Sequence, residues 1–173
     1  ALAVSERLLI AHQLKDLCYK LWASAPVKAQ QTARALTEIA AIDGREEISA
    51  LAFWASGIAE LTRGKLENAV ENLDRSAALF RKIKKEHDAA SAQVAKIIVL
   101  ALLGDYNEAV KTGKSVLRVF EKHGDELAAG KVEKNLGNII ARQSGIARAE
   151  EYYLSAMRRF GSVGDVNELT MCE

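Results

Sequence analysis

A spacing of forty residues recurs along the chain and constrains its fold more than any other feature. Phenylalanines repeat at this interval, and so do alanines that lie eleven positions before each of them. These residues are Phe80, Phe120 and Phe160, with Ala69, Ala109 and Ala149. A fixed period of this length is the signature of stacked repeats, because each repeat buries its apolar face on its neighbours. The sequence therefore predicts an array of equivalent units.

Composition and pattern indicate that each unit is helical. Apolar residues recur at helical spacing among Glu, Lys, Arg and Gln, and the 173 residues include a single proline. Alternation typical of strands is absent. We therefore expect an all-α fold, a right-handed α-α superhelix in which every unit is a hairpin of a first (A) and a second (B) helix. The expected helices, A and B in turn, span 3–23, 26–43, 45–63, 65–84, 86–103, 105–122, 125–143 and 146–161.

The expected helix ends have a physical basis in three Gly-Asp steps. Glycine adopts the left-handed conformation that closes a helix, and aspartate accepts hydrogen bonds from the free N–H groups of the next one. Pro26 suits the opening turn of the first B helix. The closing segment of the second B helix, up to His87-Asp88, contains no glycine. The three steps are Gly104-Asp105, Gly124-Asp125 and Gly164-Asp165.

The period weakens toward the N-terminus. Forty residues before Ala69, Leu73 and Phe80 the chain has three alanines, so the first hairpin is expected to be a degenerate repeat or a cap. The chain lacks an initiating Met and starts another unit near its end, which predicts a piece of a longer protein. The predicted segments are the cap at 1–44, three repeats at 45–85, 86–124 and 125–164, and the start of a further repeat at 165–173.

Composition argues against several classes of function. The net charge of +1 gives no electrostatic reason to bind nucleic acid, and no apolar stretch reaches the roughly 20 residues of a membrane span. Cys18 and Cys172 have no partner spacing, which favours a reduced, cytoplasmic setting. The cations at 81–85 could attract phosphates, but at the C-terminus of a helix they complement its dipole, which favours a structural role. The histidines show no metal spacing.

No phosphate loop, nucleophile elbow or convergent carboxylate pair is present in the sequence. We therefore expect no enzyme activity and no cofactor or metal. Repeat arrays usually provide binding surfaces.

The glycine-led B helices resemble a known family. Gly64 precedes Ala69, and Gly104 precedes Ala109, by the same five positions. This Gly-x-x-x-x-Ala hairpin resembles the tetratricopeptide repeat (TPR), although the usual TPR period is about 34 residues. The longer spacing is similar to that of extended-helix TPR arrays in multidomain bacterial signalling proteins.

The fourth A helix carries the most specific part of this resemblance. Asn135-Leu136-Gly137-Asn138 is similar to the Asn-Leu-Gly-Asn element of TPR scaffolds that hold extended peptides. The resemblance implies that the Leu and Gly pack against neighbouring helices, while both asparagines face a concave groove and bind a ligand's backbone. The corresponding positions are Ser56-Gly57 in the second A helix and Lys96-Ile97 in the third, so a continuous asparagine ladder is not expected.

Helical spacing extends this element into a candidate peptide-binding site, because residues three and four apart are neighbours. The fourth A helix would present a polar and basic wall, and the second and third an apolar wall, which suits an acidic peptide. Trp54 has an alternative position in the core, and the basic side chains could instead simply solvate their helix. The polar wall comprises Lys131, Lys134, Asn135, Asn138 and Arg142, and the apolar wall Leu51, Trp54, Ile58, Leu61, Val94, Ile98, Ala101 and Leu102.

Two interpretations of function follow. The first is a scaffold for protein–protein interaction that holds a peptide or a domain of its own polypeptide. The alternative is a regulatory or sensor segment of a larger signalling protein, such as a transcription regulator, a signalling ATPase or a protease. Apolar residues of 146–161 also predict self-association through the C-terminal end; they are Ile146, Tyr152, Tyr153 and Met157.

Overall fold

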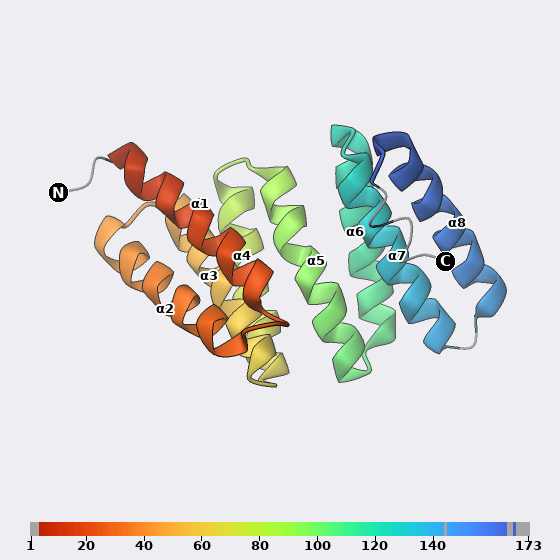
Figure 1. The fold of residues 1–173 in the computed structure, drawn as a ribbon, viewed down its shortest axis with the longest axis horizontal. Coiled ribbons are helices and arrows are strands. Elements are labelled where there is room, and N and C mark those ends of the chain that lie inside the picture. The colour runs from red at the N-terminus through yellow and green to blue at the C-terminus, as the bar shows by residue number, and fades with distance from the viewer. Residues whose placement is uncertain (1–3, 144, 166–167, 169–173) are drawn as a thin grey trace. The chain divides into compact units, whose positions relative to one another are not determined.

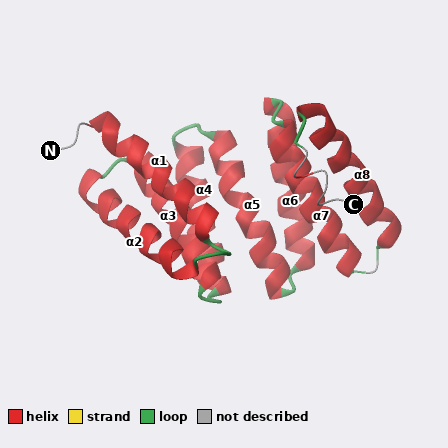
Figure 2. Ribbon diagram, viewed as in Figure 1, coloured by secondary structure: helices red, strands yellow, loops and turns green. Residues whose placement is uncertain are grey.

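The computed structural model is all-α in the residues that it describes, which are 4–143, 145–165 and 168. Eight helices account for nearly all of these residues, and none of them forms a strand (Figures 1 and 2). The all-α prediction is confirmed, and each predicted helix end lies within two residues of the observed one. The helices are α1 (Val4–Leu21), α2 (Pro26–Asp43), α3 (Glu46–Thr62), α4 (Leu66–Lys82), α5 (Glu86–Leu103), α6 (Tyr106–His123), α7 (Glu126–Arg142) and α8 (Ile146–Val163).

The chain forms two compact units, 1–99 and 100–173. In unit 1, α1 packs on α2 and α3, and α3 packs on α2 and α4. In unit 2, α7 packs on both α6 and α8. The consecutive helices α1 to α4 of unit 1 and α6 to α8 of unit 2 therefore lie side by side, as in a helical repeat. Most of the further repeat predicted at 165–173 lies outside the described residues.

The predicted turn chemistry is present at the Gly-Asp steps. Gly104, Gly124 and Gly164 all have positive φ. The side chain of Asp125 accepts a hydrogen bond from the backbone N–H of Ala128 at 2.9 Å. Asp105 and Asp165 make the same type of cap at 3.3 Å and 3.1 Å. Local sequence thus determines where these helices begin and end.

The turn after α4 has Lys84 at the position where other turns of the repeat have glycine. The Lys84 φ of 62° lies in the left-handed region, which L side chains rarely adopt. Gly44, Gly124 and Gly164, which follow α2, α6 and α8, occupy the equivalent position in the forty-residue register and also have positive φ. The turn after α4 therefore keeps the geometry of the repeat with an unfavourable residue.

The residues that define the period are core residues. The three phenylalanines and the three alanines of the repeat are buried, and Ala29 at the equivalent position of α2 is buried as well. Burying a phenylalanine contributes about 1.5–3 kcal/mol. The period thus marks the positions at which each unit buries apolar surface.

Glycines inside the helices allow close approach between neighbours. A Cβ atom on Gly57 of α3 would lie 2.7 Å from Leu73 of α4, and one on Gly137 of α7 would lie 2.7 Å from Tyr153 of α8. The two glycines are eighty residues apart, so the same contact is built twice. Gly113 of α6 similarly leaves room for Leu136 of α7.

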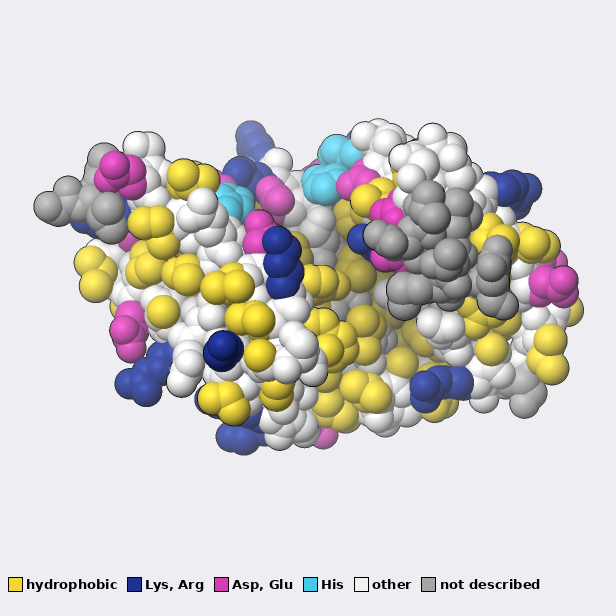
Figure 3. Space-filling model, in the orientation of Figure 1, with side chains coloured by type: hydrophobic (Ala, Val, Ile, Leu, Met, Phe, Trp, Pro, Cys, Tyr) yellow, Lys and Arg dark blue, Asp and Glu magenta, His cyan; other side chains and the backbone are white. Residues whose placement is uncertain are grey.

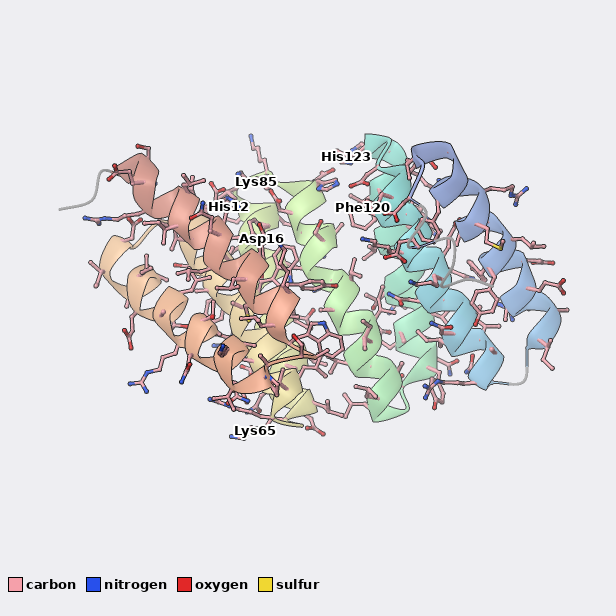
Figure 4. The ribbon with its side chains drawn as sticks, viewed as in Figure 1. His12, Asp16, Lys65, Lys85, Phe120 and His123 are labelled. Atoms are coloured by element: carbon pink, nitrogen blue, oxygen red, sulfur yellow. The ribbon has the colours of Figure 1, made fainter. Side chains whose placement is uncertain are left out.

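A polar cluster joins three elements of unit 1. Glu47 at the start of α3 lies 3.2 Å from His12 Nε2 of α1 and accepts a hydrogen bond from Lys85 Nζ at 2.6 Å. Figure 4 labels His12 and Lys85 at this end of the unit. Burial opposes ionisation of Glu47, but the hydrogen bonds from Lys85 and His12 outweigh it, so its pKa lies below the ordinary value. The cluster thus ties α1 and the α4–α5 turn to α3.

Candidate peptide-binding site

The predicted polar wall lies on one side of α7. Lys131, Asn138 and Arg142 are exposed, and Lys134 and Asn135 are half-buried. The remaining face of α7 enters the core of unit 2 through Val132, Leu136, Ile139 and Ile140, all of them buried. The structure therefore brings the five residues of the polar wall together along one helix, as their spacing predicts.

The Leu and Gly of the asparagine element pack against neighbouring helices. Leu136 is fully buried and fills the space beside Gly113, while Gly137 lies against the ring of Tyr153. The hydroxyl of Tyr153 donates a hydrogen bond to Oδ1 of Asn138 at 2.9 Å. This bond orients the carboxamide and leaves its NH₂ group as the donor for further contacts.

Both lysines of the polar wall are close to one carboxylate. Nζ of Lys134 donates to Oε2 of Glu168 at 2.5 Å, and Nζ of Lys131 lies 3.6 Å from Oε1 of the same residue. Sequence reasoning missed this contact, since Glu168 belongs to a segment considered only as the start of another repeat. The contact demonstrates that the two ammonium groups can converge on a single carboxylate.

A hydrogen-bond network that includes the buried Glu133 holds α7 and α8 together. Arg159 of α8 donates to Glu133 at 3.0 Å and to Glu126 at 2.7 Å, both on α7, and to Glu121 of α6 at 2.6 Å. Ser155 donates to Glu133 at 2.9 Å. Burial disfavours the charged guanidinium, but the carboxylates of Glu133 and Glu126 outweigh this effect and raise the pKa of Arg159. An acidic residue at a core-facing position of α7 was the available sequence signal.

The apolar wall predicted on α3 is part of the core of unit 1. Trp54 and Ile58 are only 6% and 3% exposed. The Trp54 ring packs edge-to-face on Phe80, with centroids 6.3 Å apart, and Nζ of Lys15 lies 4.5 Å from its centroid. Of the two positions considered for Trp54, the structure therefore shows the core, where α1 packs over α3.

The other predicted apolar residues differ in exposure. Val94 and Ile98 are half-buried on the part of α5 that belongs to unit 1. Leu51 is buried, Leu61 and Ala101 are half-buried, and Leu102 is exposed. Val94 and Ile98 therefore retain accessible surface, whereas Leu51 belongs to the core.

Unit 1 has an apolar surface of its own. Figure 3 shows hydrophobic side chains over α1 and α2. A hollow of about 240 Å³ lies there, lined by Ile10, Ile39, Ile42 and Arg7. The guanidinium of Arg7 is 3.5 Å from Asp43, so the charged side chain among these four residues already has a partner.

Among the described residues, His, Cys, Asp and Glu form no group of three that could hold a metal ion. Cys18 is buried, and burial raises the pKa of its thiol to about 11, which makes it a poor nucleophile. Cys172 lies outside the described residues. Within residues 4–143, 145–165 and 168, no helix is both long and apolar enough to cross a lipid bilayer.

Comparisons with known proteins connect this chain to a fold. No family model and no curated protein matches the sequence. The structure is similar to the crystal structure of BtubC (BKLC) from P. vanneervenii, with a TM-score of 0.62 over 99% of this chain and 89% of that one. The sequence identity is 12%. This likeness supports the helical fold alone.

Proposed function

We propose that the protein is a TPR-like interaction module that binds acidic peptides through the polar wall of α7. The observation that carries this proposal is the convergence of Lys131 and Lys134 on one carboxylate, on the same side of α7 as the half-buried Asn135 and the exposed Asn138. Lysine supplies charge, and carboxamides supply both donors and acceptors for a peptide backbone. Reversible recognition requires no further chemistry from this chain.

Packing supports the use of this surface. Leu136 and Gly137 fix α7 between its neighbours, and Arg159 ties α8 to the buried Glu133. Binding groups on rigid helices lose less conformational entropy when a ligand binds. A cytoplasmic scaffold, or a regulatory segment that holds another domain of its own polypeptide, would use the same wall.

A peptide display selection on the immobilised protein tests the proposal. Enriched peptides should be rich in Asp and Glu. Lys131→Glu with Asn135→Ala should weaken their binding at least tenfold, because it replaces a cation with an anion and removes a carboxamide. The matched control is Lys114→Glu with Asn107→Ala, which makes the same chemical changes at exposed positions of α6. Equal losses in both variants, or enrichment of peptides without acidic residues, would refute the proposal.

Self-association is the second candidate function. Ile146 and Leu154 of α8 are 76% and 52% exposed, although both are large apolar side chains. Apolar side chains exposed on a single helix favour contact with another chain. Light scattering of the wild type and of Ile146→Lys with Leu154→Lys tests this candidate, which predicts a concentration-dependent dimer only in the wild type. A monomeric wild type would eliminate it.

A further inference from the structure

The chain itself supplies a carboxylate to the polar wall of α7. Glu168 accepts from Lys134 at 2.5 Å, with Lys131 at 3.6 Å. The Lys134 and Glu168 side chains are only 16% and 18% exposed, whereas Lys131 remains 46% exposed. Most of the Lys134 surface is thus covered in the structure.

Local structure delivers Glu168 to this position. α8 ends at Val163, and Gly164 reverses the chain with a φ of 71°. The backbone N–H of Glu168 then donates to Oδ1 of Asp165 at 3.1 Å. This bond ties Glu168 to Asp165, and the Glu168 carboxylate lies beside α7, so the contact follows from the same Gly-Asp chemistry that shapes the repeats.

We propose that Glu168 is an internal competitor for the peptide site, which an acidic ligand must displace before it binds Lys134. This inference rests on the proposed function, because it assigns regulation to the same wall. The Lys134 ammonium is the nearest donor to the Glu168 carboxylate, so a peptide carboxylate and Glu168 compete for it. Binding therefore responds to the occupancy of the Glu168 contact.

The size of the effect follows from the strength of the ion pair. Partly exposed ion pairs are weak, so Glu168 occupies the site for most but not all of the time. The apparent affinity for a ligand is proportional to the fraction of protein in which the site is free. Removing the competitor should therefore tighten binding about three- to tenfold.

Fluorescence anisotropy with a labelled decaglutamate peptide, at low and high salt, tests the inference. Glu168→Gln should bind the probe about three- to tenfold more tightly than the wild type, with a smaller gain at high salt. Glu151→Gln removes the same charge from an exposed position of α8 and is the matched control. In a Lys134→Gln background, Glu168→Gln should give a smaller gain, because the main partner of the competitor is gone.

The outcomes separate the inference from the function on which it rests. Equal gains for Glu168→Gln and Glu151→Gln would overturn the internal competitor while leaving peptide binding in place. An absence of probe binding by the wild type and by both variants would overturn the peptide site together with its competitor. Thermal melts check that each variant remains folded.

Discussion

α3 and α7 occupy equivalent places in the forty-residue register, yet one buries the side that the other exposes. Trp54 and Ile58 of α3 correspond to Lys134 and Asn138 of α7, eighty residues later. On α3 this side carries apolar residues and lies in the core, whereas on α7 it carries polar residues and remains accessible except where Glu168 covers it. One helical position can therefore be used for packing in one unit and for recognition in another.

The neighbours of the two helices explain the difference. α1 packs against α3 and places Lys15 over the indole of Trp54. The lysine stem covers apolar surface while its charge faces the aromatic ring. On α7 the side chain of Glu168 contacts Lys134, which is the residue equivalent to Trp54.

The first prediction has the largest expected effect and compares the stability of a core variant of α3 with that of a polar-wall variant of α7. Trp54→Ala should lower the free energy of unfolding by about 3–5 kcal/mol, because it leaves a cavity beside Phe80. Asn138→Ala, on the equivalent side of α7, should lower the free energy of unfolding by no more than about 0.5 kcal/mol plus the contribution of one exposed hydrogen bond. Urea titrations measure both changes. Similar losses for the two variants would contradict the assignment of α3 to packing and α7 to binding.

The second prediction compares the shared glycine contact. Gly57→Ala should cost about 1–3 kcal/mol, since the new Cβ would meet both the buried Leu73 and the Ala69 carbonyl oxygen. Gly137→Ala should cost less, because the half-buried Tyr153 ring has room to shift. Thermal unfolding of the two variants ranks them. A more stable Gly57→Ala protein would show that the close approach is not required.

The third prediction concerns the turns that follow α4 and α8. Lys84→Gly should stabilise the protein by about 0.5–1 kcal/mol, since glycine adopts a positive φ without steric cost. Gly164→Lys makes the reverse change after α8 and should destabilise by a similar amount. Denaturant midpoints measure both. Opposite signs support a common turn geometry, and a destabilising Lys84→Gly would argue against it.

The smallest expected effect is a pH dependence that comes from Glu47 at the start of α3. The equivalent residue of α7 is Leu127, which does not titrate. The folded pKa of Glu47 lies below its ordinary value of 4.5, so the ionised carboxylate stabilises the fold above that pH. This contribution is lost as the pH falls through the folded pKa. Glu47→Gln should therefore be less stable than the wild type at pH 7, with a difference that shrinks below about pH 4.5. A difference that does not change with pH would exclude an ionic role.

Local signals predicted the fold, because helix ends depend on nearby residues. The Gly-Asp steps place the starts of α6 and α7 to within one residue. No local signal indicated the left-handed turn at Lys84, since lysine carries no preference for that conformation. Only the position of the turn in the forty-residue register indicated it.

The candidate site was predicted in part, because side-chain spacing on one helix is local but coverage of that helix is not. The spacing of Lys131, Asn135 and Asn138 placed them on one side of α7. The burial of Trp54 depends on α1, and the ion pair of Lys134 depends on Glu168. Both contacts join residues more than thirty positions apart, and helical periodicity does not contain that information.

The most direct test of the account is an NMR titration of the isotope-labelled protein with the decaglutamate peptide. Side-chain amide signals of Asn135 and Asn138 report on α7, and the indole N–H of Trp54 reports on the equivalent side of α3. Trp22→Phe leaves a single indole signal for assignment, because the chain has two tryptophans. We expect saturable shifts of the asparagine signals and an unchanged Trp54 signal. A shifted Trp54 with unmoved asparagines would contradict the account.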